Sequence, residues 1–157
     1  EYISEAIEKG AVAIVAQRDE DISNFVSSSI TIIRVENIRK ALAIMAIAYY
    51  DNPASKLNMI GITGTKGKTT TAYMTRDILL ASGKKAGMIG TIYNTYGDVS
   101  IESSRTSPES LDLQKLLRDM VDAGIEYVVM EVSSHALELY RVYGITFKIG
   151  VFTNLAP

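Results

Sequence analysis

The chain has 157 residues, a net charge of −2 and no cysteine, and 47% of its residues are apolar. This composition allows a buried core and excludes a disordered chain, disulfide bonds and thiolate metal sites. We expect no nucleic acid partner, because such binding rests on clustered Lys and Arg. No apolar run approaches the roughly 18 residues that span a bilayer, and the first residues lack the basic and apolar segments of a signal peptide. We therefore expect a cytoplasmic protein with no membrane partner.

The first fifty residues predict a small α/β unit. Residues 3–8 have the spacing of a helix. The continuous apolar run at residues 11–16 predicts a strand buried on both faces, and the β-branched run at residues 30–35 predicts a second strand.

A second helix is predicted to begin after Asn37, which can cap it, and to end at about Tyr50. Its predicted core positions are Ile38, Leu42, Met45 and Ala46. A turn sequence with Pro53 ends this helix, so we expect a domain boundary there. Residues 1–52 then belong to a first domain and residues 57–157 to a second.

Beyond this boundary, predicted strands and helices alternate. The strands are expected at residues 57–63, 85–89, 127–131 and 147–153. The helices are expected at residues 68–82, at 107–123 with Pro108 in the first turn, and from about residue 134. A polar hairpin is expected at residues 91–101. This alternation predicts an α/β fold with a mainly parallel sheet and right-handed crossovers.

A glycine-rich turn lies between the strand at residues 57–63 and the helix that follows it. Glycines let backbone amides face an anion and the helix N-terminus adds partial positive charge, so this context predicts a phosphate-binding loop for ATP rather than an ordinary βα turn. Lys68 can reach the terminal phosphates, and Thr69 can ligate magnesium. The strict pattern G-x-x-x-x-G-K-[ST] is not met, because Ile62 stands where its first Gly belongs. The residues expected to contact ATP are Gly64, Thr65, Lys66, Gly67, Lys68, Thr69 and Thr70.

Glu131 ends a predicted buried strand, at the edge where ligands of open α/β sheets bind. A magnesium ion held only by a Thr hydroxyl and phosphates requires a carboxylate nearby, so we interpret Glu131 as its second protein ligand. The alternative is a solvated glutamate at a strand end.

Polar residues precede two of the predicted helices. Thr106 and Ser107 could cap the first of these helices, and their hydroxyls and amides also suit an anionic substrate. Ser133 could cap the next helix, and Arg141 could be a surface charge. A Ser/His hydrolase is disfavoured, because the G-x-S-x-G turn is absent and His135 is the only histidine.

Taken together, several segments resemble the Mur ligases of peptidoglycan synthesis. The resembling segments are Gly61–Thr71, Gly90-Thr91-Ile92, Thr106-Ser107-Pro108-Glu109, Met130–Leu137 and Phe152-Thr153-Asn154-Leu155. The Glu-Val-Ser-Ser-His stretch that starts at Glu131 is typical of the branch that adds a diamino acid, L-lysine or meso-diaminopimelate, to UDP-MurNAc-L-Ala-D-Glu. By this resemblance, residues 1–52 are the end of an N-terminal UDP-binding domain and residues 57–157 the first part of the central ATP-binding domain.

The resemblance implies an ATP-dependent ligase that phosphorylates the substrate's carboxylate and then lets an amine attack the acyl phosphate. Lys68 would contact the transferring phosphate, and Thr69 with Glu131 would hold Mg²⁺. The residues that would hold the UDP-muramoyl peptide are Thr106, Ser107, Ser133 and Arg141. The full-length protein is expected to be a monomer.

The sequence also departs from the family pattern. Lys66 stands where many members have Asn, and Leu139 stands where some have a substrate-binding Gln. The family's Asp-His motif, carbamylated lysine and C-terminal domain would follow Pro157, so we expect residues 1–157 to be an internal fragment that ligates nothing by itself. Two alternatives stay open: another ligase of the superfamily, such as folylpolyglutamate synthase, or a P-loop module without ligase activity. No Asn/Thr-Lys-x-Asp segment of a switch GTPase is present.

Overall fold

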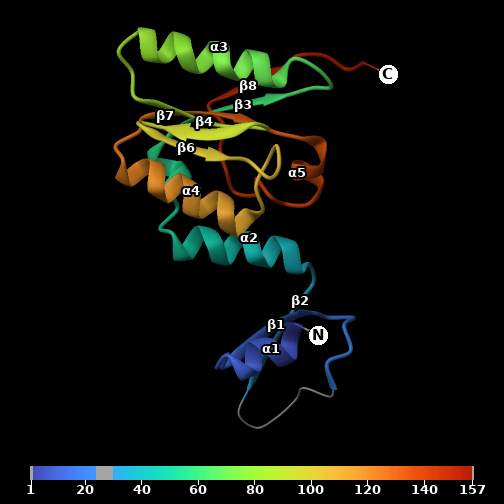
Figure 1. Ribbon diagram of the computed structural model, residues 1–157. Helices are drawn as coiled ribbons and strands as arrows, with labels where there is room; N and C mark the ends of the chain where they lie inside the picture. Colours follow the sequence, from blue (N-terminus) through green and yellow to red (C-terminus); the bar gives the residue numbers. More distant parts are fainter. Residues whose placement is uncertain (1, 24–29, 157) are drawn as a thin grey trace. The chain divides into compact units, whose positions relative to one another are not determined.

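The computed structural model describes residues 2–23 and 30–156 (Figure 1). Its contacts divide the chain into two compact units, Glu1–Ala41 and Leu42–Pro157. The division falls within a helix, earlier than the boundary expected beside Pro53, and the two-domain assignment stays a prediction. In the part of the chain that the structure describes, no helix has the length and apolarity needed to cross a bilayer.

The first unit contains helix α1 (Tyr2–Glu8) and a parallel pair of strands, β1 (Ala13–Gln17) and β2 (Thr31–Val35). Buried positions (Ile14 and Ala16) alternate along β1 with one exposed and two half-buried positions. The expectation of a strand buried on both faces is therefore wrong. A strand needs covering layers on both sides for that, and alternating burial shows that β1 is covered on one face only.

Helix α2 (Ile38–Tyr49) begins where the sequence predicts, and the amide of Lys40 donates to Asn37 Oδ1 at 2.9 Å, which confirms the cap. Its buried face confirms the predicted core position Ala46 and contradicts the predicted positions Leu42 and Met45. The fully buried side chains are those of Ala43 and Ala46, whereas Leu42 and Met45 are among the exposed hydrophobic residues. Small alanine side chains let a helix pack closely against its neighbours. The buried face of α2 is therefore the one that carries Ala43 and Ala46, and not the one that carries Leu42 and Met45.

The second unit contains a six-stranded sheet in the order β6-β5-β4-β7-β3-β8. Its strands are β3 (Asn58–Thr63), β4 (Ala86–Ile89), β5 (Tyr93–Tyr96), β6 (Val99–Glu102), β7 (Tyr127–Glu131) and β8 (Ile149–Phe152). The strands β4, β7, β3 and β8 are parallel, and the β5–β6 hairpin extends the sheet in antiparallel fashion. The predicted α/β class with a mainly parallel sheet is confirmed.

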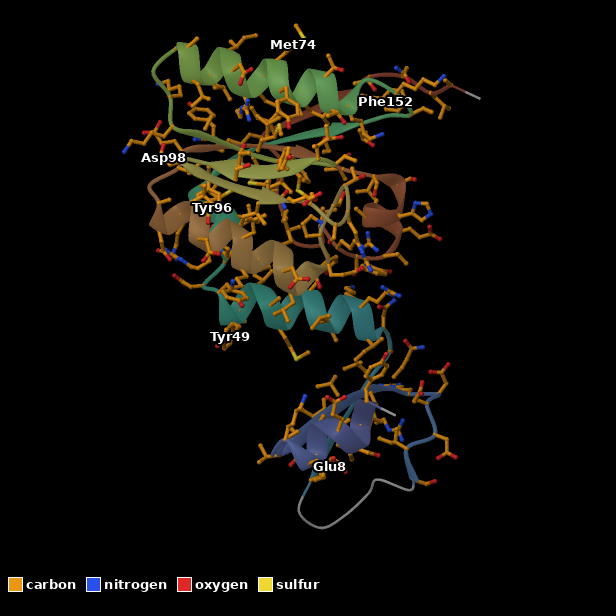
Figure 2. All side chains as sticks on the ribbon, in the orientation of Figure 1. Glu8, Tyr49, Met74, Tyr96, Asp98 and Phe152 are labelled. Carbon is orange, nitrogen blue, oxygen red and sulfur yellow. The ribbon has the colours of Figure 1, made fainter. Side chains whose placement is uncertain are left out.

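Two helices cover opposite faces of this sheet (Figure 1). Alternate residues of the central strands pack against α4 (Ser110–Asp122) on one face, as Val128 does, and against α3 (Lys68–Ala81) on the other, as Val129 does. Met74 lies on the outer side of α3 and is exposed, whereas Tyr96 packs against the core cluster that includes α4 (Figure 2). Helices cover both faces of the central strands, so apolar residues stand at successive positions along these strands.

Helix α4 begins at Ser110, with Glu109 at its N-cap position. The prediction that it opens at Ser107, with Pro108 in its first turn, is wrong. The hydroxyl of Ser107 bonds elsewhere, as described below, and the chain becomes helical only after Glu109. The remaining elements of this unit are a single 3₁₀ turn (Pro53–Lys56) and the short helix α5 (Ser134–Glu138).

Candidate active site

The loop between β3 and α3 requires glycine at two positions. Gly67 is the N-cap residue of α3 and has a φ of 83°, in the left-handed region. Gly64 has a φ of 134°, and a Cβ built there would lie 2.8 Å from the carbonyl oxygen of Asn154. Backbone conformation and close packing therefore both exclude a side chain at Gly64.

The segment after β8 holds this loop in place. Asn154 accepts hydrogen bonds from the amides of Thr65 (3.0 Å, to its carbonyl) and Lys66 (3.1 Å, to its Oδ1). The carbonyl of Lys66 in turn accepts from Thr153 Oγ1 at 2.8 Å and from Asn154 Nδ2 at 3.0 Å. The amides of Thr65 and Lys66 thus donate to other residues of the protein. The amides in the first turn of α3, in contrast, have no hydrogen-bond partner within the helix.

Lys68 and Thr69 open helix α3, next to the loop. Lys68 Nζ donates to the carbonyl of Gly64 at 2.6 Å and lies 3.3 Å from that of Thr65, so this half-buried amine folds back over the loop. Thr69 is also half-buried, and Thr70, one residue further, is exposed. The loop, an ammonium group and a helix N-terminus therefore meet at one place, the arrangement that binds phosphates.

Glu131 ends β7, next to β3 in the sheet, and its side chain is fully buried. Its Oε2 accepts from Thr69 Oγ1 at 2.9 Å and from Thr91 Oγ1 at 3.1 Å, and its Oε1 accepts from the amide of Thr91 at 3.0 Å. These contacts exclude the alternative of a solvated strand-end glutamate. No ion pair found among residues 2–23 and 30–156 includes Glu131. Burial without a cation is costly for a carboxylate, so this group suits a bound metal ion.

Ser107 links the loop before α4 to the end of β7. Its side chain is fully buried; its hydroxyl donates to the carbonyl of Glu131 at 3.0 Å and accepts from the amide of Ser133 at 3.2 Å. Ser133 also caps α5, since its Oγ accepts from the amide of Ala136 at 3.1 Å. Both serines thus have structural partners, and their contact with a substrate stays a prediction.

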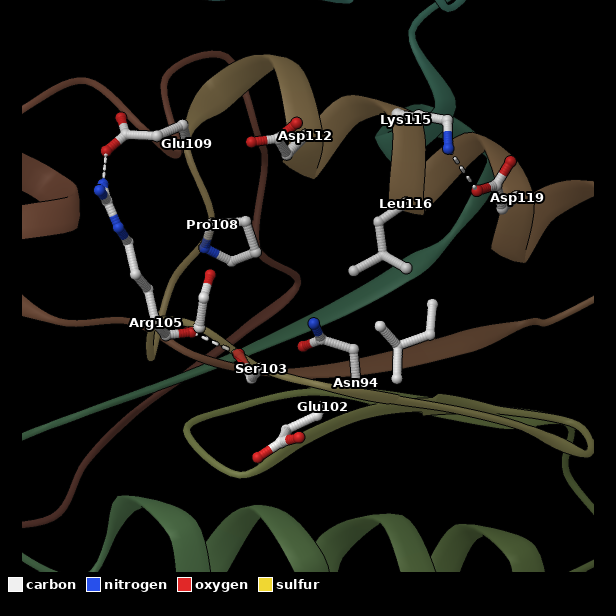
Figure 3. A pocket seen from close by; sticks show the side chains of 12 residues that line it. Asn94, Glu102, Ser103, Arg105, Pro108, Glu109, Asp112, Lys115, Leu116 and Asp119 are labelled. Atoms are coloured by element: carbon white, nitrogen blue, oxygen red, sulfur yellow. Dashed lines mark hydrogen bonds and ion pairs between the residues drawn. The ribbon is translucent and has the colours of Figure 1, made fainter.

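Arg141 is not a surface charge, because its side chain is only 13% exposed. Its Nη2 pairs with Glu109 Oε1 at 2.8 Å, and its Nη1 donates to the carbonyl of Ser107 at 3.3 Å. The buried Nε of Arg141 has no partner among the described residues. Glu109 also pairs with Arg105 (Figure 3). The carboxylate therefore holds two guanidinium groups beside the segment that contains Thr106.

A cavity of about 360 Å³ joins parts of the site. It is lined by Thr63, Gly64, Thr65, Lys68, Ser133, Ser134, Phe152 and Leu155. Thr106 lies outside this lining, but its Oγ1 is 3.1 Å from Thr91 Oγ1. Within the described ranges, no cluster of three or more His, Cys, Asp or Glu side chains could hold a metal ion by itself. A metal here would need phosphate oxygens in addition to Thr69 and Glu131.

Three residues that complete this arrangement were assigned no role from the sequence: Thr91, Thr153 and Asn154. Each follows the end of a strand, β4 or β8, at the same edge as Glu131. Polar residues directly after parallel strands are a usable signal, because the carboxyl ends of such strands meet at one edge of the sheet.

Comparisons with known proteins show the family to which the chain belongs. The model of the Mur ligase middle domain matches residues 62–157. A protein of Clostridium perfringens is 54% identical over 154 residues, which are 98% of this chain and 31% of the relative. One of Caldanaerobacter subterraneus is 52% identical over 155 residues, or 99% of this chain and 31% of the relative. Both are named UDP-N-acetylmuramoyl-L-alanyl-D-glutamate–2,6-diaminopimelate ligase.

A solved structure of an enzyme with the same name superimposes with a TM-score of 0.80 at 23% sequence identity. The match covers 99% of this chain and 30% of that structure, and it shows a shared fold. The chain thus spans less than a third of the length of these curated relatives and of this solved structure.

Proposed function

Because the chain belongs to the Mur ligase family, we propose that the full-length protein is an ATP-dependent ligase that adds 2,6-diaminopimelate to UDP-MurNAc-L-Ala-D-Glu in peptidoglycan synthesis. The choice of diaminopimelate over lysine rests on the names of the relatives at 54% and 52% identity. We further propose a cytoplasmic monomer, in which residues 1–52 end the UDP-binding domain and residues 57–157 begin the ATP-binding domain. Through peptidoglycan, the activity would support cell shape and division.

The observation that carries this proposal is the contact of Thr69 Oγ1 with the buried Glu131 carboxylate at 2.9 Å, directly beside the glycine-rich loop. A hydroxyl and a carboxylate are oxygen ligands, which Mg²⁺ prefers, and the carboxylate has no cationic partner in the described part of the chain. The residues present therefore fit magnesium. When bound together with ATP, the ion would neutralise phosphate charge.

ATP would lie over the loop of residues 64–70. Lys68 would exchange its present hydrogen bonds to loop carbonyls for the transferring phosphate, and the first-turn amides of α3 would face the other phosphates. The exposed Lys66 adds a second positive charge near the same loop. These residues bind and orient the nucleotide and supply no nucleophile.

The muramoyl dipeptide would bind beside Thr106, Ser107, Ser133 and Arg141. Its terminal carboxylate would enter the cavity that Lys68 and Ser133 share, where it faces the transferring phosphate. The carboxylate oxygen attacks the terminal phosphorus of ATP, and ADP leaves. The amine of the diamino acid then attacks the acyl carbon, inorganic phosphate leaves, and the amine loses a proton. Holding these reactants a few ångströms apart accounts for about 7–11 kcal/mol of such barriers.

The test is amine-dependent ADP release by the full-length protein. UDP-MurNAc-L-Ala-D-Glu is supplied with Mg·ATP and, in parallel, 2,6-diaminopimelate, lysine, glutamate or no amine, and the products are identified by mass spectrometry. We expect ADP and a tripeptide product with diaminopimelate. Product with lysine alone would refute the proposed amine. ADP release with a folate substrate and glutamate, or no release with any amine, would favour the superfamily alternative or the non-catalytic module.

A further inference from the structure

A series of hydrogen-bonded side chains joins the two proposed substrate sites. Thr69, at the ATP loop, contacts Glu131 at 2.9 Å; Glu131 contacts Thr91 at 3.1 Å; and Thr91 contacts Thr106, beside the proposed muramoyl site, at 3.1 Å. Among the described residues, Thr91 is thus the one whose side chain forms hydrogen bonds with both Glu131 and Thr106.

Proton count fixes the direction of these bonds. A carboxylate accepts only, so the hydroxyls of Thr69 and Thr91 both donate to Glu131. A hydroxyl has a single proton, so the oxygen of Thr91 accepts from Thr106. Thr69 then presents only lone pairs to a cation, and Thr106 presents only lone pairs to whatever binds against it.

Thr91 also restricts Glu131 from a second direction. Its amide donates to Oε1 at 3.0 Å while its hydroxyl donates to Oε2, so one residue holds both carboxylate oxygens. A Cβ built on the neighbouring Gly90 would lie 2.5 Å from Oε1, which shows how closely the backbone encloses the group. The orientation of Glu131 toward Thr69 therefore depends on Thr91.

We propose that Thr91 is a positioning residue that serves both ends of the site. It rests on the proposed function above. At the metal end it orients the carboxylate of Glu131 toward Thr69. At the other end its hydroxyl oxygen accepts a hydrogen bond from the Thr106 hydroxyl, so the substrate group that contacts the Thr106 hydroxyl is an N–H or O–H donor, and the carboxylate of the muramoyl peptide binds elsewhere.

The test uses four variants of the full-length protein. Thr91→Val removes the hydroxyl and keeps the side-chain volume and the backbone amide; Thr91→Ser restores the hydroxyl. Thr95→Val is the matched control, because that hydroxyl accepts from Arg76 Nη1 at 3.1 Å, away from Glu131. Calorimetric titration measures the dissociation constant of ADP with Mg²⁺ and, separately, with a chelator present. Steady-state assays give the KM for the muramoyl dipeptide.

We expect Thr91→Val to weaken Mg·ADP binding by about tenfold and metal-free ADP binding by less than about twofold. Its KM for the muramoyl dipeptide should rise by a similar factor of about ten. Thr91→Ser and Thr95→Val should match the wild type in both measurements. Because Thr91 is exposed, Thr91→Ala loses little packing and should reproduce the effect of valine if the valine variant misfolds.

Wild-type binding of Mg·ADP by both Thr91→Val and Thr91→Ala would overturn the positioning role, even in an active enzyme. Equal weakening of ADP with and without metal would overturn it too, because that result indicates general damage to the loop. A wild-type protein that binds Mg·ADP but forms no tripeptide would instead refute the proposed function, and the titrations would still decide the role of Thr91 at the metal end.

Discussion

Two regions of the second unit carry many polar groups but hold them differently. At the carboxyl edge of β3, β4 and β7, Glu131 is fully buried and accepts hydrogen bonds from Thr69 and Thr91. In a second, outer region, between the β5–β6 hairpin and α4, a cavity of about 390 Å³ has six charged residues in its lining (Figure 3). They are Glu102, Arg105, Glu109, Asp112, Lys115 and Asp119.

Four charges of the outer region form ion pairs with each other, Arg105 with Glu109 and Lys115 with Asp119. Lys115 and Asp119 are 3.9 Å apart, with side chains 64% and 43% exposed. Such pairs contribute about 0–1 kcal/mol, because solvent screens them. Solvent does not screen the buried carboxylate of Glu131 in this way. Its hydrogen-bond donors, Thr69 and Thr91, converge on its two oxygens. The larger cavity is thus the weaker candidate site, and burial with converging donors identifies the chemistry better than volume or charge.

The largest expected effect is at Lys68. In the full-length protein, Lys68→Ala should lower the affinity for Mg·ATP by about tenfold to a hundredfold, because a charged hydrogen bond to phosphate is lost. Lys66→Ala is the matched control: it removes the same charge from the same loop, but its side chain has no contact that positions the loop, and affinity should change less. Calorimetric titration measures both. Equal losses would mean that only the net charge of the loop matters.

Glu131→Gln should have the next largest effect, on the metal. The amide side chain keeps the size of the carboxylate and loses its charge, so the magnesium concentration for half-maximal activity should rise by about tenfold. Metal-free nucleotide binding should be unchanged. Glu126→Gln, on the exposed residue before the same strand, is the control. A wild-type magnesium titration of the Glu131→Gln enzyme would contradict the metal role.

Gly90→Ala should act on the same carboxylate from the backbone. The new Cβ would meet Glu131 Oε1 at 2.5 Å and Cδ at 3.3 Å, so the side chain must move. We expect a loss of about 1–3 kcal/mol in the free energy of unfolding, measured with urea, and a several-fold weaker response to magnesium. Gly150→Ala is the control, because nothing lies within 4 Å of its Cβ position. Equal stability of Gly90→Ala and Gly150→Ala would show that the Glu131 side chain moves away from the new Cβ without cost.

The smallest effect is expected at an ion pair within α4, away from the carboxyl edge. Arg118 Nε donates to Asp122 Oδ2 at 3.0 Å, and this hydrogen bond lowers the pKa of Asp122 below its ordinary value of 3.8. A lowered pKa in the folded state adds stability above the ordinary pKa, and this stability is lost as the pH falls through the folded pKa. Asp122→Asn should therefore destabilise slightly at about pH 7 and less at about pH 3, which lies below the ordinary pKa, where this stability is being lost.

Urea unfolding at both pH values measures this difference, and ADP binding by Asp122→Asn should equal that of the wild type. A loss of nucleotide affinity in this variant would mean that the end of α4 is coupled to the carboxyl edge, and the contrast between that edge and the surface ion pairs would not hold.

The sequence by itself determined the order of elements in the second unit and the place of the glycine-rich loop between β3 and α3. Continuous apolar runs, glycines and helix caps are local signals, so they located β3, α3, β7 and Glu131 to within one or two residues. The same signals failed for β1 and for the buried face of α2. An apolar run cannot reveal how many layers cover it, and side-chain size does not determine which helix face packs.

Only the tertiary structure decided which residues surround Glu131. Thr69 is 62 positions from Glu131 and Thr91 is 40, and Asn154 is 88 positions from Lys66, whose amide it binds. Sheet order and register bring these residues together, because the carboxyl ends of β3, β4, β7 and β8 meet at one edge. The order of strands in the sheet is a property of the whole fold, and no local sequence pattern predicts it. The loop and the carboxylate could be predicted from their own segments, whereas their partners could be identified only in space.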